Sequence, residues 1–138
     1  MRVELYAALV SSGLLLAAVP VAAHHAFAAE FDRNQPVTVR GTVTKVELVN
    51  PHSWLWVDVK GDDGQVVQWS FEMGAPALLL RRGWTRDAVK PGTVVQVEGY
   101  RAKSGLPAAS CRSVKLPDGR DLFGGSSGDG DQSQADSK

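Results

Sequence analysis

The sequence predicts a mainly β fold: a small antiparallel barrel of five strands, with one short helix between the third and fourth strands. Three observations lead to this prediction. Apolar and polar residues alternate in several short segments, as they do in strands with one buried face. Clusters of Gly, Pro, Asn and Asp separate these segments. The chain has 138 residues, which is enough for one domain with an apolar core.

Residues 1–23 have a different composition and predict an export signal peptide. A basic residue stands near the start, an apolar run follows over residues 5–19, and small residues lead up to Ala23. Cleavage after Ala23 would make His24 the N-terminus. A second small-x-small site at residues 26–28 would remove both neighbouring histidines instead. We therefore expect a periplasmic or secreted protein of the bacterial envelope, without a transmembrane anchor after cleavage. A segment retained as an anchor is the alternative.

The first strand is predicted in "PVTVRGTVTKVELV", residues 36–49. Its alternation slips between Val43 and Val46, which indicates a β-bulge or bend near Thr44. Gly41 fits a sharp coiling of the same strand. The Asn-Pro sequence that follows is typical of a turn, because proline restricts both its own backbone and that of the residue before it.

A β-hairpin is predicted over residues 53–73. A two-residue loop would mix the two faces, whereas the three-residue loop Asp62-Asp63-Gly64 aligns them and puts glycine at the left-handed position. One face then pairs the apolar residues Leu55, Val57 and Val59 with Phe71, Trp69 and Val67. The other face carries His52, Trp54, Trp56 and Asp58 opposite Glu72, Ser70 and Gln68.

The second half of the chain predicts a helix and two further strands. "APALLLRRG" is the helix, ended by Gly83. Alternation predicts strands in "TVVQVEGYRAK" and "AASCRSVKLPDGRDLF", and the latter ends in a turn and a short terminal strand or hook. Five strands with this helix fit a barrel of the oligonucleotide/oligosaccharide-binding (OB) type. A simple meander or a fragment of a β-sandwich is the alternative.

The charge of the chain argues against two classes of partner, and its cysteine content excludes an internal disulfide. The chain has 15 basic and 15 acidic residues and no net charge, so there is no electrostatic basis for binding nucleic acid or an acidic membrane. Cys111 is the one cysteine, which excludes an internal disulfide, and we expect it to be buried. A single domain is expected over residues 24–123. The Gly-, Ser- and Asp-rich residues 124–138 are expected to be disordered.

Four segments together resemble a known family: "HHAFAAEFD", "GTVTKVELVNPHSW", "LLLRRGW" and "PGTVVQVEGYRAKSG". The chain is similar, from His24 to about Ser127, to the small exported bacterial proteins called domain of unknown function 6152. That family opens with His-His-Ser-Phe or a similar start, and Ala26 replaces the serine here. Its Asn-Pro-His-x-Trp element is present from Asn50 to Trp54. The resemblance implies an envelope location and a small β-barrel, and it implies no established activity.

The candidate metal ligands are all three histidines of the chain, His24, His25 and His52. An N-terminal His24 would offer its ring and its α-amine, whose ordinary pKa of about 7.7–8.0 lets it deprotonate near neutral pH. With a third nitrogen from His52 or His25, this set suits copper(II) and resembles the histidine brace of secreted copper proteins. His25 could also bind through the amine, the intervening amide and its own ring. Zinc fits less well, because a structural site needs four protein ligands.

The histidines also have an ordinary structural interpretation. Two neighbouring histidines after a signal peptide can form a flexible polar start, and His52 can hydrogen-bond the backbone of its turn.

Trp54 and Trp56 are the candidate ligand-binding residues, together with Glu72 opposite them. Two residues apart on a strand, the two rings lie on one side and could stack on a ligand. The favoured alternative is that the N-terminal segment covers them with Phe27 and Phe31, which would bring His24 close to His52.

The sequence favours binding over catalysis. It contains no Ser-His-Asp or Cys-His arrangement of recognisable spacing, and we predict no catalytic residues. We expect a metal-binding envelope protein that handles or senses copper. A module that binds a small ligand or partner on its aromatic strand face, without metal, is the alternative.

Overall fold

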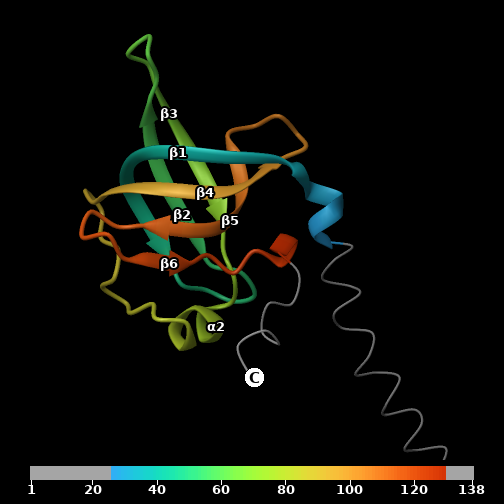
Figure 1. Cartoon of the computed structure of the whole chain (residues 1–138), viewed down its shortest axis with the longest axis vertical. Coiled ribbons are helices and arrows are strands. Elements are labelled where there is room, and N and C mark those ends of the chain that lie inside the picture. Colours follow the sequence, from blue (N-terminus) through green and yellow to red (C-terminus); the bar gives the residue numbers. More distant parts are fainter. Residues whose placement is uncertain (1–25, 130–138) are drawn as a thin grey trace, which may run out of the picture.

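The computed structural model describes residues 26–129 and is mainly β, as predicted (Figure 1). A helical turn over residues 26–30 precedes the first strand. The elements that follow are β1 (Phe31–Glu47), β2 (Trp54–Lys60), β3 (Val66–Glu72), α2 (Pro76–Arg81), β4 (Val94–Ala102), β5 (Ala108–Lys115), β6 (Asp121–Phe123) and the 3₁₀ turn η1 (Ser127–Asp129). The helix α2 lies between the third and fourth strands, where it was predicted, and the expected terminal hook is the sixth strand.

The strands form one sheet in the order β3-β2-β1-β4-β5-β6, and β3 also pairs in parallel with β5. All other pairs are antiparallel. No helix among residues 26–129 is long and apolar enough to span a bilayer. The predicted signal peptide and both N-terminal histidines lie outside the described residues.

The first strand is long because it pairs with two other strands. Its N-terminal part pairs with β4 and its C-terminal part with β2, and the two ladders meet at Thr42. The register with β2 shifts between Val43 and Lys45, which confirms the bulge predicted at Thr44. A Cβ atom on Gly41 would clash with the carbonyl oxygen of Asp58, so glycine permits the close approach of β2 at this bend.

The predicted hairpin register is confirmed. Leu55 pairs with Phe71, Val57 with Trp69, and Trp54 with Glu72. Gly64 has a φ angle of +79°, the left-handed conformation that the three-residue loop requires.

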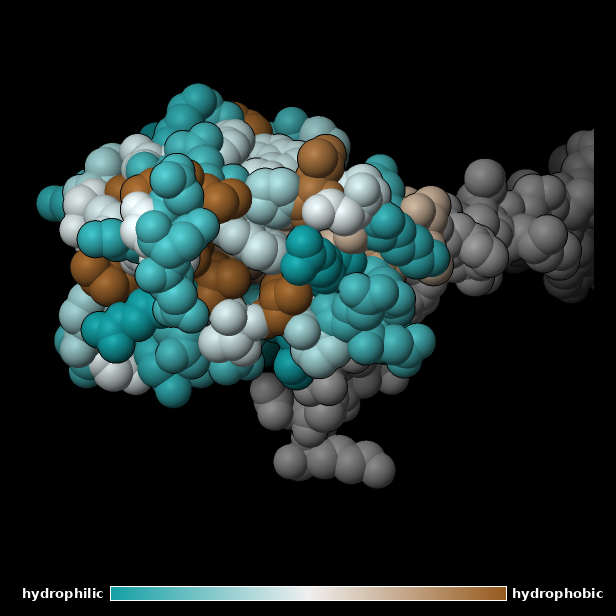
Figure 2. Space-filling view, turned by 90° about the horizontal axis from the view of Figure 1, so that it is seen from above, coloured by the Kyte–Doolittle hydropathy of each residue, from teal (hydrophilic) through white to brown (hydrophobic). Residues whose placement is uncertain are grey.

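The apolar face of the hairpin is buried only near its base. Leu55, Val57 and Phe71 are fully buried, whereas Val67 is 45 % exposed because the tip of the hairpin projects beyond the sheet (Figure 1). Seen from above, apolar residues form small separate patches among polar ones (Figure 2). That face therefore presents no continuous apolar surface.

The core is closed at one end by α2 and the segment that follows it (Figure 1). Leu79 of the helix is fully buried, and Trp84 is 2 % exposed. The indole Nε1 of Trp84 donates a hydrogen bond of 2.7 Å to the carbonyl oxygen of Phe123, which ties this end to β6. Cys111 is fully buried in the same core, as expected.

The expected end of the folded domain after Phe123 is too early. The Gly124 amide donates to the carbonyl of Arg112 at 2.6 Å, and its carbonyl accepts from the Gly74 amide at 3.0 Å. Ser126 is buried and shares a 2.8 Å hydrogen bond with Ser110 on β5. A Cβ on Gly124 would clash with the Cys111 carbonyl, so glycine here permits close packing, although the composition suggested disorder. Residues 130–138 lie outside the described part.

Candidate functional site

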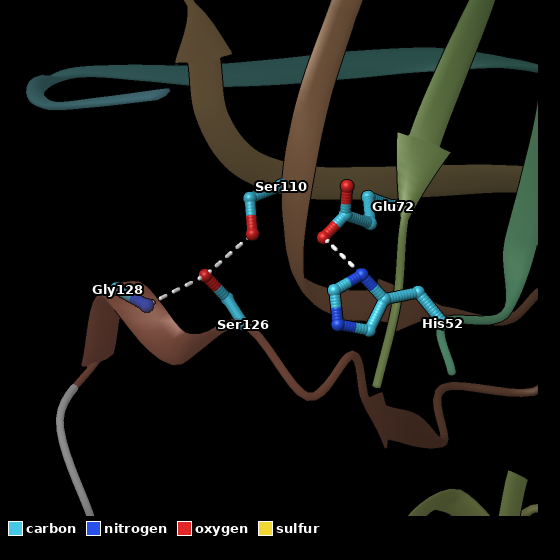
Figure 3. A network of polar contacts seen from close by, with 5 residues as sticks. All are labelled: His52, Glu72, Ser110, Ser126 and Gly128. Carbon is cyan, nitrogen blue, oxygen red and sulfur yellow. Dashed lines mark hydrogen bonds and ion pairs between the residues drawn. The ribbon is translucent and has the colours of Figure 1, made fainter. Parts of the chain in front are cut away.

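His52 and Glu72 form a pair at the base of the hairpin. The Nδ1 atom of His52 lies 2.7 Å from Oε1 of Glu72 (Figure 3). Glu72 ends β3, and His52 stands in the loop before β2. The Ser53 amide donates to the Gly74 carbonyl and the Met73 amide donates to the Ser53 carbonyl, so the loop is bound to the end of β3. This extension of the ladder holds the imidazole beside the carboxyl group.

Burial raises the pKa of Glu72 above its ordinary value of 4.5, and the negative charge of Glu30 raises it further. The nearby His52 acts in the opposite direction and only partly offsets the burial. The side chain of Glu72 is 18 % exposed, whereas that of His52 is 52 % exposed.

The second ring nitrogen of His52, Nε2, points away from Glu72 (Figure 3). When Nδ1 carries the proton, Nε2 has a lone pair for a metal ion or a proton. The carboxyl group thus fixes one nitrogen and leaves the other available.

The pair lines a cavity of about 310 Å³. Its walls come from the N-terminal turn, the loop before β2, the end of β3 with the segment after it, β5 and the C-terminal segment. The N-terminal turn contributes Ala26, Phe27, Glu30 and Phe31. The first described residue therefore stands at the same cavity as His52.

The N-terminal turn is anchored at this cavity by aromatic packing and by one lysine. Phe27 is 6 % exposed, and its ring centroid lies 5.7 Å from that of Phe31 and 5.6 Å from that of Tyr100. A Cβ atom on Gly128 would lie 2.5 Å from the Phe27 ring, so the C-terminal segment packs on the ring directly. The Nζ atom of Lys103 donates to the Ala28 carbonyl at 2.5 Å. These contacts fix where the chain enters the fold.

The expected covering of both tryptophans by Phe27 and Phe31 is not found. Phe27 and Phe31 pack with Tyr100 because the N-terminal turn runs beside the end of β4. Trp54 and Trp56 stack on each other with centroids 6.2 Å apart, and both rings are half-buried. Trp54 lines a second cavity together with residues of the N-terminal turn.

The predicted site residues therefore divide between two neighbouring cavities. His52 and Glu72 belong to the first and Trp54 to the second, while Trp56 lines neither. Among residues 26–129, no group of three or more His, Cys, Asp or Glu side chains is placed to hold a metal ion. Sequence reasoning missed the anchoring role of Lys103, because a lone surface lysine carries no distinguishing pattern.

Replacing His52 by alanine is expected to raise the pKa of Glu72 further, because the positive charge and hydrogen bond of the imidazole lower it. Glu30→Gln is expected to lower that pKa, since the charge of Glu30 raises it. A carbon-detected NMR titration of the Glu72 carboxyl in the metal-free protein measures both changes. Asp58→Asn, farther along the same strand face, is the control. An unchanged midpoint in His52→Ala would contradict the pairing.

The raised pKa of Glu72 also sets the direction in which the free energy of unfolding changes with pH. The folded state binds the Glu72 proton more tightly than the unfolded state does. The contribution of Glu72 to the free energy of unfolding is therefore complete below pH 4.5, and it is lost as the pH rises through the raised pKa.

Comparison with known proteins places the chain in a family. No curated protein and no solved structure matches it. A family model matches residues 11–110, which is most of the chain and includes His52, Glu72 and both stacked tryptophans. The chain therefore belongs to the family of unknown function DUF6152.

Proposed function

We propose that this protein is an exported envelope protein that binds a metal ion, with copper(II) favoured, through an N-terminal histidine site completed by His52. The observation that carries the proposal is the anchored N-terminal turn. Phe27 is packed in place, and Ala26 lines the same cavity as His52. His25 directly precedes Ala26 in the sequence, and two residues of backbone span at most about 7 Å. Both N-terminal imidazoles are thus within reach of that cavity.

The donor atoms suit copper(II). A chain that begins at His24 supplies an amine nitrogen and a ring nitrogen, and Nε2 of His52 or the ring of His25 supplies a third. The carboxyl of Glu72 holds Nδ1 of His52 at 2.7 Å. A metal-bound histidine commonly donates its other N–H to a carboxylate, which orients the ring and makes it a stronger ligand. Glu72 would therefore act through His52, whereas the sequence predicts it as a ligand-binding residue.

The proposed role is the handling or sensing of the metal ion, without turnover. Ser110, which pairs with Glu72 between β5 and β3 and lines the same cavity, shares its hydrogen bond with Ser126, whose Oγ accepts from the Gly128 amide at 3.1 Å (Figure 3). These hydroxyls hold the C-terminal segment in place and are not aligned with the imidazole as a nucleophile and base would be. Export to the envelope, proposed from the leader sequence, is consistent with a copper-binding role.

For the fold we propose an OB-like five-stranded barrel made by β1 to β5. The pairings β1–β2, β2–β3, β3–β5, β5–β4 and β4–β1 form a closed circuit, which supports this proposal. The position of α2 between β3 and β4 also fits it.

The test is a calorimetric copper(II) titration of metal-free protein that mass spectrometry shows to begin at His24. One copper ion per chain is the expected result. His52→Ala and Glu72→Gln are each expected to weaken binding by about 10- to 100-fold, by loss of a ligand and of its orienting partner respectively. Asp58→Asn is the matched control, because Asp58 shares the strand face but does not line the cavity. Equal binding by a chain that starts at Ala26 would overturn the proposal.

A further inference from the structure

A second cavity of about 400 Å³ lies beside the His52 cavity, within the usual range of about 300–1,000 Å³ for small-molecule sites. It opens between the N-terminal turn, β2 and β3, and the loop from β4 to β5. Its walls include the aromatic rings of Phe31 and Trp54, and its other side chains are mostly small. Small side chains line it at Ala29, Ala102, Ala108 and Ala109.

Trp54 is the tryptophan that lines this cavity. Trp56 stacks against it at 6.2 Å with an interplanar angle of 27°. The Nζ atom of Lys45 lies 4.9 Å from the centroid of Trp56 and also pairs with Glu47. Trp54 lines the cavity and Trp56 does not, so a ligand in the cavity would meet the row of stacked groups at Trp54. A flat ring placed in the cavity can extend that row by stacking.

The small residues of this cavity offer few hydrogen-bonding groups. Their backbones are already in ladders: Ala102 pairs with Phe31, Ala108 with Ser70, and Ala109 with Phe71. Alanine side chains have no donors or acceptors. A sugar carries hydroxyl groups around its ring. Each hydroxyl that loses its water on binding and gains no hydrogen-bond partner costs binding free energy. An aromatic ring carries no such penalty, so the lining favours it over a saccharide.

Polar side chains are present in small number. Ser70 and Ser104 offer hydroxyls, and Glu30 and Lys103 bring charges of opposite sign. The ammonium of Lys103 already donates to the Ala28 carbonyl. The lining thus favours a ligand without net charge that has one or two hydrogen-bonding substituents.

We infer that this cavity binds a small uncharged aromatic compound of the phenol class, whose ring stacks on Trp54 and whose hydroxyl meets the polar side chains. The site does not require the metal ion of the proposed function, although Glu30 and Phe31 line both cavities. It is therefore testable on metal-free protein.

The probe is p-cresol, titrated into metal-free protein and followed by amide NMR and calorimetry. Saturable binding is expected, with the largest amide shifts at Ala102, Ala108 and their neighbours. Trp54→Leu removes the stacking ring and Ala108→Leu fills the cavity, and each is expected to weaken binding at least about 10-fold. Trp56→Leu is the matched control and is expected to change the affinity less than about 2-fold.

Several results would overturn the inference. These are no binding of p-cresol to the wild-type chain, shifts that map away from Ala102 and Ala108, or an equal loss in Trp56→Leu. Tighter binding of methyl glucoside than of p-cresol would overturn the aromatic class. Because copper is absent throughout, none of these outcomes depends on the metal site, and failure of copper binding leaves this test intact.

Discussion

Acetylating the α-amine of His24 is expected to weaken copper(II) binding by about 100-fold, or about 2.7 kcal/mol. Acetylation removes the lone pair of the amine and leaves all three imidazoles in place. The proposed chelate at the first residue uses that amine and the ring of His24 together, so loss of the amine breaks the chelate and leaves the ring as a single donor. A competition titration against a copper chelator measures the change.

Two comparisons make the acetylation result specific. The acetylated chain must carry unmodified lysines, because Lys103 anchors the N-terminal turn through its Nζ atom. Its amide NMR spectrum should match that of the unmodified chain over residues 31–123. Equal copper affinity with and without the acetyl group would mean that the amine is not a ligand.

Phe71→Ala is expected to reduce the free energy of unfolding by about 3–5 kcal/mol, because it removes a large side chain from the core and leaves a cavity. Phe71 is fully buried on β3, where it stacks with Trp69 at 6.0 Å and pairs with both Leu55 and Ala109. Urea denaturation followed by circular dichroism measures the loss. For a chain of this size that is a large part of the total stability.

Val66→Ala on the same strand is the matched control for Phe71→Ala. Val66 is 58 % exposed near the hairpin tip, and the expected loss is below about 0.5 kcal/mol. A loss below about 1 kcal/mol for Phe71→Ala would contradict the burial of this face.

Features that depend on neighbouring residues could be predicted from the sequence. The bulge at Thr44 follows from a slip in alternation, and the hairpin register follows from the three-residue loop before Gln65. That register also put His52 and Glu72 on one face, because a strand alternates its side chains between two faces. The contact between His52 and Glu72 itself depends on the loop before β2. The backbone hydrogen bonds of that loop to Gly74 could not be read from the sequence pattern.

Contacts between distant segments could not be predicted in the same way. The packing of Phe27 on Tyr100 depends on where the N-terminal turn meets β4. The ordered segment after Phe123 looked like a flexible tail because its glycines and serines carry no apolar pattern. Its order comes from the space that Gly124 and Gly128 leave for Cys111 and Phe27.

The division of β1 between two partners also bears on how the chain folds. Glu47 pairs with Trp54, which is close in sequence, whereas Val37 pairs with Gly99, far along the chain. Closing a short loop loses less chain entropy than closing a long one. We therefore expect the meander of β1, β2 and β3 to form first. We expect the docking of β4 along the N-terminal part of β1, which has the higher contact order, to limit the folding rate. Until β4 arrives, half of the longest strand has an open edge.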